Sequence, residues 1–162
     1  MTAFKRLSVR HFGARLGAAS VLTAAVVALP PLLPHTAQPA EAATQATTAL
    51  GVAASKKGSP YQWGAAGPNR FDCSGLTLYS FKQAGRTLPR TAAAQYRSTQ
   101  HISADSRQAG DLVFFHYGLA YSSVYHVGIY AGHGRIWHAP RTGARVRLER
   151  IWARGVWYGR VN

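Results

Sequence analysis

A single cysteine and two spaced histidines are the residues of this 162-residue sequence that could do chemistry together. Cys73 follows Asp72 and opens an apolar segment that we interpret as a helix ending at Gly85. Unpaired N–H groups and the positive end of the helix dipole favour a thiolate at such a position, so Cys73 is a candidate nucleophile. The alternative for an isolated Cys73 is a small buried hydrophobe, because free cysteine is often fully inside.

A nucleophile needs a base, and His126 and His138 lie on the two arms of a predicted hairpin. Strands are expected over residues 124–131 and 135–139, on either side of a glycine-bracketed turn. This spacing places the two histidines directly opposite each other or one place off, with Cβ atoms roughly 5 Å apart if paired. We expect His126 to take the proton of Cys73 and return it to the leaving amine, while His138 orients the ring of His126.

The same three residues could form a catalytic zinc set with one open position, because thiolate plus imidazoles is an accepted coordination. The usual short-spaced ligand pairs are absent from the sequence, and no carboxylate obviously supports the histidines. We therefore expect no metal and no other cofactor at Cys73, His126 and His138.

The elements that must position these residues change in kind along the chain. Three helices come first and a run of antiparallel strands follows, which indicates an α+β fold. The helices are expected over residues 44–57, from the Asp72 N-cap to Gly85, and within residues 90–100. The strands are expected over residues 112–116, 124–131, 135–139, 145–149 and 155–161.

The charge composition excludes several classes of enzyme. The sequence has 19 Lys and Arg against 5 Asp and Glu, so carboxylates are scarce. A two-carboxylate glycosidase, a calcium cage or a two-metal carboxylate site has almost nothing to be built from. A hydrophobic content of 47% excludes general disorder, and one cysteine excludes an internal disulfide.

The first 42 residues have the pattern of a secretory signal peptide. Four basic residues precede an uncharged apolar run, and Ala40-Glu41-Ala42 has the form expected ahead of cleavage. The alternative is an uncleaved membrane anchor, which Pro30 and Pro31 disfavour. We expect residues 1–42 to be removed and residues 43–162 to be an exported basic domain. Such a domain attracts anionic wall polymers, anionic lipid surfaces or nucleic acid, and charge alone does not choose among them.

Six short blocks together resemble a known family, in the order that the family has them. They are Tyr61-Gln62-Trp63-Gly64, Asp72-Cys73-Ser74-Gly75-Leu76, Leu88-Pro89-Arg90-Thr91, Ala109-Gly110-Asp111-Leu112-Val113-Phe114-Phe115, His126-Val127-Gly128-Ile129-Tyr130 and His138-Ala139. Over roughly residues 45–160 the sequence resembles the NlpC/P60 cysteine peptidases. The resemblance implies a papain-like α+β fold in which the nucleophile helix packs on an antiparallel sheet. It also implies a bacterial cell-wall endopeptidase that cuts peptidoglycan stem peptides between D-γ-glutamate and a diamino acid.

By the same resemblance, the family nucleophile falls on Cys73, its base on His126 and its orienting residue on His138. The active-site tyrosine of the family falls on Tyr61. Tyr61 and the backbone N–H of Cys73 would then hold the oxyanion of the reacting carbonyl.

Three residues beside the nucleophile are candidate substrate contacts: Asp72, Ser74 and Trp63. Helix capping is the alternative role of Asp72 and Ser74. The family usually has Trp-Gly-Gly where this chain has Trp63-Gly64-Ala65, so the loop next to the site is expected to differ in shape. The aromatic segment 116–125 is either a wall of the substrate site or an ordinary loop.

These observations predict a secreted, wall-associated cysteine peptidase that hydrolyses peptidoglycan stem peptides through an acyl-enzyme. We expect a monomer that can also bind anionic wall polymers and that does not bind nucleic acid. One alternative is a non-catalytic, cationic wall-binding protein. Another is an amidase or acyltransferase that acts on a different exported substrate with the same triad.

Overall fold

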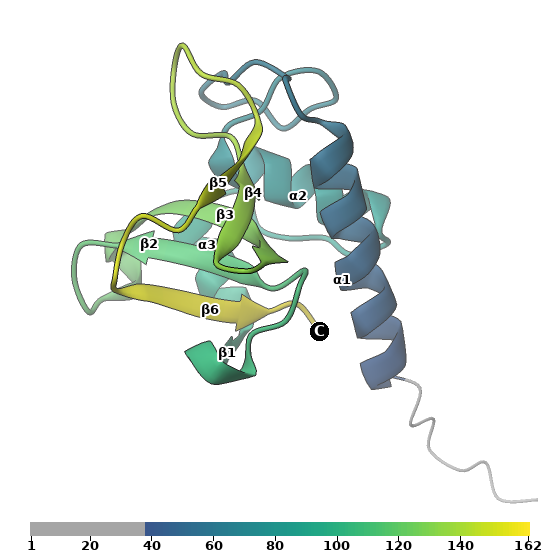
Figure 1. Ribbon diagram of the computed structural model, residues 1–162, viewed down its shortest axis with the longest axis vertical. Coiled ribbons are helices and arrows are strands. Elements are labelled where there is room, and N and C mark those ends of the chain that lie inside the picture. Colours follow the sequence, from purple (N-terminus) through teal and green to yellow (C-terminus); the bar gives the residue numbers. More distant parts are fainter. Residues whose placement is uncertain (1–37) are drawn as a thin grey trace, which may run out of the picture. The chain divides into compact units, whose positions relative to one another are not determined.

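Three helices lead into a six-stranded antiparallel sheet in the computed structural model, which describes residues 38–162 (Figure 1). The helices are α1 (Gln38–Ser55), α2 (Cys73–Gln83) and α3 (Ala92–Ser98). The strands are β1 (Gln100–Ile102), β2 (Leu112–His116), β3 (Val124–Gly132), β4 (Arg135–His138), β5 (Arg147–Arg150) and β6 (Val156–Arg160). Helices therefore precede strands along the described chain, which confirms the expected α+β class.

The sheet has the strand order β1-β6-β2-β3-β4-β5, so the last strand in sequence lies between β1 and β2. The hairpin that carries the histidines, β3 and β4, lies next to β5 at the other edge. Strand β1 was not expected from the sequence. Its three residues follow α3 directly, and they pair only with β6, where Gln100 faces Arg160.

Helix α1 begins at Gln38, six residues before the expected start. Along its first turns, Thr44 and Thr47 point back along the helix and donate hydrogen bonds to the carbonyls of Ala40 and Ala43. Most of the predicted signal peptide, residues 1–42, lies outside the described residues, and its cleavage stays a prediction. Within residues 38–162, no helix has the length and apolar character needed to cross a bilayer.

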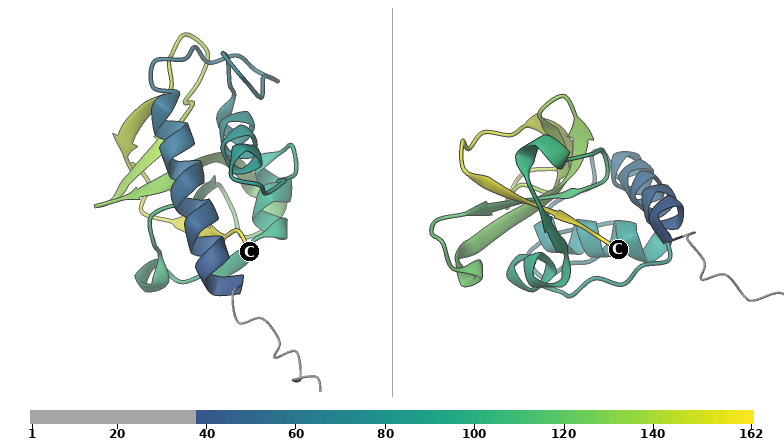
Figure 2. Two further views of the ribbon diagram at one scale, coloured as in Figure 1. Left: turned by 90° about the vertical axis from the view of Figure 1, so that its right-hand side faces the viewer. Right: turned by 90° about the horizontal axis from the view of Figure 1, so that it is seen from below.

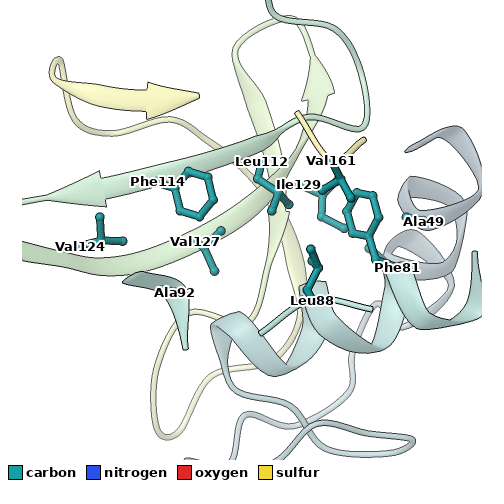
Figure 3. Packing of buried hydrophobic residues seen from close by; sticks show 11 residues of the cluster. Ala49, Phe81, Leu88, Ala92, Leu112, Phe114, Val124, Val127, Ile129 and Val161 are labelled. Carbon is teal, nitrogen blue, oxygen red and sulfur yellow. The ribbon is translucent and has the colours of Figure 1, made fainter. Parts of the chain in front are cut away.

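The main hydrophobic core lies between the sheet and the helices. Figure 3 shows Phe114 of β2 and Ile129 of β3 with Phe81 of α2 and Ala49 of α1 around one buried cluster. Figure 2 shows α1 and α2 on the same side of the sheet. Burying one such phenyl ring contributes about 2–3 kcal/mol to folding. The core thereby fixes α2, and with it Cys73, against β3.

The opposite face of the sheet is covered as well. Val113 and Phe115 of β2 point there and pack with Tyr130, Ile136 and Tyr158. Because successive side chains of a strand point to opposite faces, a strand covered on both faces is apolar at every position. This explains why Leu112 to Phe115 form an uninterrupted buried run.

The β3–β4 hairpin has a different register from the one expected. Ile129 faces Trp137 and Tyr130 faces Ile136, and a shift occurs before Gly132 pairs with Arg135. The expected placement assumed a hairpin centred on Gly132, whereas the first two of these pairs are centred on His133, so the register carried on from them sets Gly128 rather than His126 opposite His138. His126 and His138 are thus diagonal neighbours on one face rather than directly opposed or one place off.

Candidate active site

Cys73 is the first residue of α2 and is half-buried against β3. The helix start predicted a thiolate at Cys73, and this prediction is wrong. Burial raises the pKa of the Cys73 thiol above its ordinary value, and the neighbouring Asp72 carboxylate adds to the rise. The backbone N–H groups of Val127 and Ser74 act in the other direction and are outweighed. The resting site therefore favours a thiol, which a base must deprotonate.

Asp72 caps α2 and also holds the loop in front of it. Its Oδ1 accepts from the N–H of Gly75 at 2.7 Å, and its Oδ2 accepts from the N–H of Gly64 at 2.9 Å. Arg90 forms a two-pronged ion pair with the same carboxylate, and one of its nitrogens also donates to Ser74 Oγ at 3.0 Å. With 4% of its surface exposed, Asp72 has its oxygens engaged inside the protein.

The two histidines form a direct ring-to-ring contact. Nε2 of His126 and Nδ1 of His138 lie 2.9 Å apart, and the ring planes are nearly perpendicular at 82°. Gly128 makes room for this contact, because a Cβ at that position would come within 3.2 Å of the Cβ of His138 and 2.8 Å of Ile136. The absence of a side chain at Gly128 thus allows the two rings to meet diagonally.

Burial keeps both rings neutral. It lowers the pKa of His126 to about 3, and the neighbouring His138 acts in the same direction. Burial also lowers the pKa of His138, against the opposing effect of Glu149. A neutral His126 can accept a proton, as a general base must.

Glu149 of β5 completes this side of the site, and sequence reasoning missed it. Its Oε2 lies 3.0 Å from Nε2 of His138 and accepts from Nε of Arg147 at 2.7 Å. The carboxylate that the histidines lacked in the sequence is therefore present in the fold. The signal available was that Glu149 alternates with apolar residues on a predicted strand, but its neighbour in the sheet could not be read from local sequence.

Trp152 is a second residue that sequence reasoning missed. Its ring stacks on Phe115 at 4.0 Å and lies within 5.5 Å of the rings of both His126 and His138. It covers the histidine pair while keeping half of its own surface exposed.

The arrangement does not suit the zinc set considered above. One nitrogen of His126 and one of His138 face each other, so these two atoms cannot both turn to a shared ion. Across residues 38–162, no three histidine, cysteine or acidic side chains gather in a metal-binding arrangement.

Two clefts meet at Cys73. The first, of about 640 Å³, is lined by Cys73, His126, His138, Glu149, Tyr61, Trp63, Tyr117, Tyr125, Pro140, Arg141, Arg147 and Trp152. The second, of about 530 Å³, is lined by Cys73, Asp72, Ser74, Arg90, Trp63, Gly64, Thr91, Ala92, Ala93, Val124 and Tyr125. All seven predicted site residues, Cys73 included, therefore line these two clefts, and Tyr117 and Tyr125 of the 116–125 segment form part of the wall of the first.

Tyr61 and Trp63 come from the loop between α1 and α2. Burial raises the pKa of the Tyr61 phenol, and the nearby Cys73 and Asp72 raise it further, so the phenol remains a hydrogen-bond donor. Trp63 is 82% exposed and borders both clefts. The N–H of the next residue, Gly64, is held by Asp72, so the cap of α2 also fixes the start of this loop.

A cysteine at a helix start that faces histidines on an antiparallel sheet defines the papain-like class of α+β fold. Residues 58–160 match the NlpC/P60 family. The chain belongs to the NlpC/P60 family, which confirms the resemblance seen in the six sequence blocks.

Two relatives show how far the likeness extends along the chain. The chain is 49% identical over 109 residues to a protein named probable endopeptidase p60 from Listeria seeligeri, covering 64% of this chain and 20% of the relative. It is 48% identical over 88 residues to the bifunctional muramidase/DL-endopeptidase CwlT of Bacillus subtilis, covering 54% of this chain and 27% of the relative. The chain thus spans only a minor part of the length of these relatives.

Solved structures confirm the fold. The P60 domain of the antigen MAP1204 from M. avium subspecies paratuberculosis superposes with a TM-score of 0.65 at 28% identity, covering 74% of this chain and 96% of that one. The peptidoglycan hydrolase RipB of Mycobacterium tuberculosis superposes with a TM-score of 0.65 at 26% identity, covering 79% of this chain and 68% of that one.

Proposed function

We propose that this protein is a cysteine endopeptidase that hydrolyses peptidoglycan stem peptides. The observation that carries the proposal is that Cys73 and His126 line one cleft, while Nε2 of His126 forms a hydrogen bond with Nδ1 of His138. The names of the relatives support the substrate class, since one is a DL-endopeptidase and another a peptidoglycan hydrolase.

The reaction is acyl transfer in two steps. His126 takes the proton of the Cys73 thiol, and the sulfur attacks the scissile carbonyl to form a carbon–sulfur bond. The carbon–nitrogen bond then breaks, and the leaving amine receives the proton from His126. In the second step His126 deprotonates a water molecule, whose oxygen attacks the acyl carbon. The carbon–sulfur bond breaks, His126 returns its proton to the Cys73 sulfur, and the released acid loses its proton to solvent as the new carboxylate. Because burial raises the pKa of the Cys73 thiol and lowers the pKa of His126, both rest in neutral form, and His126 takes the thiol proton in the course of the reaction.

The oxyanion that forms on the carbonyl needs donors already in place. Tyr61, which borders the cleft with Cys73, supplies a phenolic O–H, and the backbone N–H of Cys73 at the helix start supplies the second. Removing one such donor typically costs a hundredfold or more in rate.

The bond proposed for cleavage joins D-γ-glutamate to a diamino acid. Trp63 offers an exposed ring at the junction of the two clefts, and Ser74 borders the second cleft as a further contact. The Asp72 carboxylate is occupied by partners within the protein. We propose that it does not contact the substrate itself but holds Ser74 and Arg90, which do. Arg90, with 40% of its side chain exposed, then supplies a cation that suits a stem-peptide carboxylate.

We further propose that the protein is exported through the leader in residues 1–42 and works in the cell wall as a monomer. Residues 43–162 hold 15 of the 19 Lys and Arg and 4 of the 5 Asp and Glu, and this formal charge of +11 favours contact with anionic wall polymers.

The test is mass spectrometry of fragments released from a defined stem peptide by the purified protein, beside a Cys73→Ala variant. The proposal predicts new termini at the D-γ-glutamyl bond, no fragments from Cys73→Ala, loss of activity with a thiol alkylator and retention with a chelator. Undiminished release from Cys73→Ala would refute it. Sensitivity to the chelator alone would favour a zinc enzyme, binding of intact wall without release would favour a wall-binding protein, and other new termini would favour an amidase or acyltransferase.

A further inference from the structure

We propose that Glu149 is a positioning residue that fixes which nitrogens of His138 and His126 carry protons. The inference rests on the proposed function, because it concerns how His126 is prepared to act as the base. It starts from an unbroken line of contacts. Glu149 Oε2 lies 3.0 Å from His138 Nε2, and His138 Nδ1 lies 2.9 Å from His126 Nε2.

The carboxylate of Glu149 decides where the first proton in this line lies. Arg147 donates to Oε2 of Glu149 and lowers the pKa of that carboxyl, and the bond from His138 adds to the effect. An ionised carboxylate only accepts hydrogen bonds. The proton between Glu149 and His138 therefore belongs to His138 Nε2.

The proton on His138 in turn determines which nitrogen of His126 is protonated. A neutral imidazole has one N–H and one lone pair. With its proton on Nε2, His138 can only accept at Nδ1, so His126 must donate from its own Nε2. The lone pair of His126 is then left on Nδ1. Glu149, two rings away from the thiol, thereby selects the nitrogen that takes the proton of Cys73.

Glu149 also stabilises the positive charge that forms on His126 during the reaction. When His126 takes the thiol proton it becomes an imidazolium, and the Glu149 charge favours this form. His138 is 1% exposed, so the interaction runs through a ring shielded from water, while Glu149 keeps 38% of its surface exposed. The adjacent strands β4 and β5 hold the two residues in place, with His138 facing Arg147 in the register.

The decisive test observes the protons directly, without substrate. Imidazole nitrogen NMR spectra separate a protonated nitrogen from one that carries a lone pair, and the signals are assigned with His126→Gln and His138→Gln variants. The expected wild-type result is a proton on Nε2 and a lone pair on Nδ1 for both rings. In Glu149→Ala both rings should also populate the opposite tautomer. Finding Nδ1 protonated in the wild type, or an unchanged spectrum in Glu149→Ala, would overturn the proposal.

Kinetics provide the second readout. We expect Glu149→Ala to lose about tenfold to a hundredfold in kcat with KM nearly unchanged, since the residue acts through His138 rather than on substrate. Glu149→Gln should lose less, because its amide oxygen can still accept from His138. The matched control is Asp105→Asn, which removes an exposed carboxylate from the turn Ala104–Ser106 and should match the wild type.

The two proposals fail in distinguishable ways. A rise in KM with kcat retained would assign Glu149 to substrate binding and overturn the positioning role. An unchanged kcat in Glu149→Ala would overturn it as well. If the wild type released no fragments at all, the proposed function would fail, while the tautomer spectra would still decide the proton arrangement.

Discussion

Two carboxylate–arginine pairs border the clefts that meet at Cys73, and they differ in what surrounds them. Asp72 with Arg90 is a saturated pair, because backbone N–H groups of Gly64 and Gly75 occupy the carboxylate together with the guanidinium. It fixes the helix start and the adjoining loop. Its charge raises the pKa of Cys73, so it does not help the thiol to ionise.

The pair formed by Glu149 and Arg147 has one further partner, His138. Its charge favours the protonated form of His126, the form that we propose arises when His126 takes the thiol proton. The comparison teaches that the distance of a carboxylate from the nucleophile does not decide its role. The carboxylate next to the thiol holds the backbone, and we propose that the more distant one prepares the base.

The largest expected effect is the loss of catalytic rate when His126, the proposed base, is replaced. His126→Gln removes the only group that we propose takes the proton of Cys73, so fragment release should fall by about a thousandfold or more. The measurement is initial rate on a defined stem peptide. An unchanged melting temperature would show that the variant is folded, whereas a rate within threefold of the wild type would contradict the assignment of the base.

The next largest expected effect is a loss of stability when the pair formed by Asp72 and Arg90 is broken. Asp72→Asn leaves Arg90 without its buried counter-charge, and we expect a loss of roughly 3 kcal/mol in the free energy of unfolding. The measurement is urea unfolding. Glu149→Gln is the matched control, because its half-exposed pair should contribute at most about 1 kcal/mol. Equal losses from both substitutions would remove the distinction between the two pairs.

A smaller effect should follow from acid. His126 has a pKa of about 3 in the folded protein against 6.5 ordinarily. Between these two pH values the unfolded chain binds a proton at His126 and the folded chain does not. The free energy of unfolding should therefore fall as pH drops below 6.5, by roughly 2 kcal/mol at pH 5. Glu149, whose pKa is lowered, adds its own loss only below its ordinary 4.5.

Urea unfolding across this range checks the acid prediction, with His126→Gln as the control. The variant should show a shallower decline between pH 6.5 and 4.5. Parallel declines in the two proteins would show that His126 does not remain neutral in the fold.

The sequence revealed the parts of the site that depend on local signals. An N-capping Asp72 before an apolar run marks the start of α2, and a glycine-bracketed turn marks the hairpin, so Cys73, His126 and His138 could be found together. The α+β order followed from the same local patterns.

What the sequence could not reveal depends on contacts between distant segments. The register of β3 with β4 is centred on His133 rather than Gly132, and Gly128 leaves the space in which the two rings meet. The glycine-bracketed turn alone did not fix either feature. Glu149 reaches His138 only because β5 pairs with β4. The raised pKa of Cys73 arises from burial against β3, which outweighs the effect of the helix start that the sequence suggested.

The central claim is that Cys73 carries the acyl group during turnover. Its most direct test is intact-protein mass spectrometry of samples mixed with excess stem peptide and quenched in acid at successive times. The account predicts an adduct with the mass of the acyl half of the substrate, located on the peptide that contains Cys73 and absent from Cys73→Ala. Fragments that accumulate at the wild-type rate in Cys73→Ala, with no adduct on either protein, would contradict it.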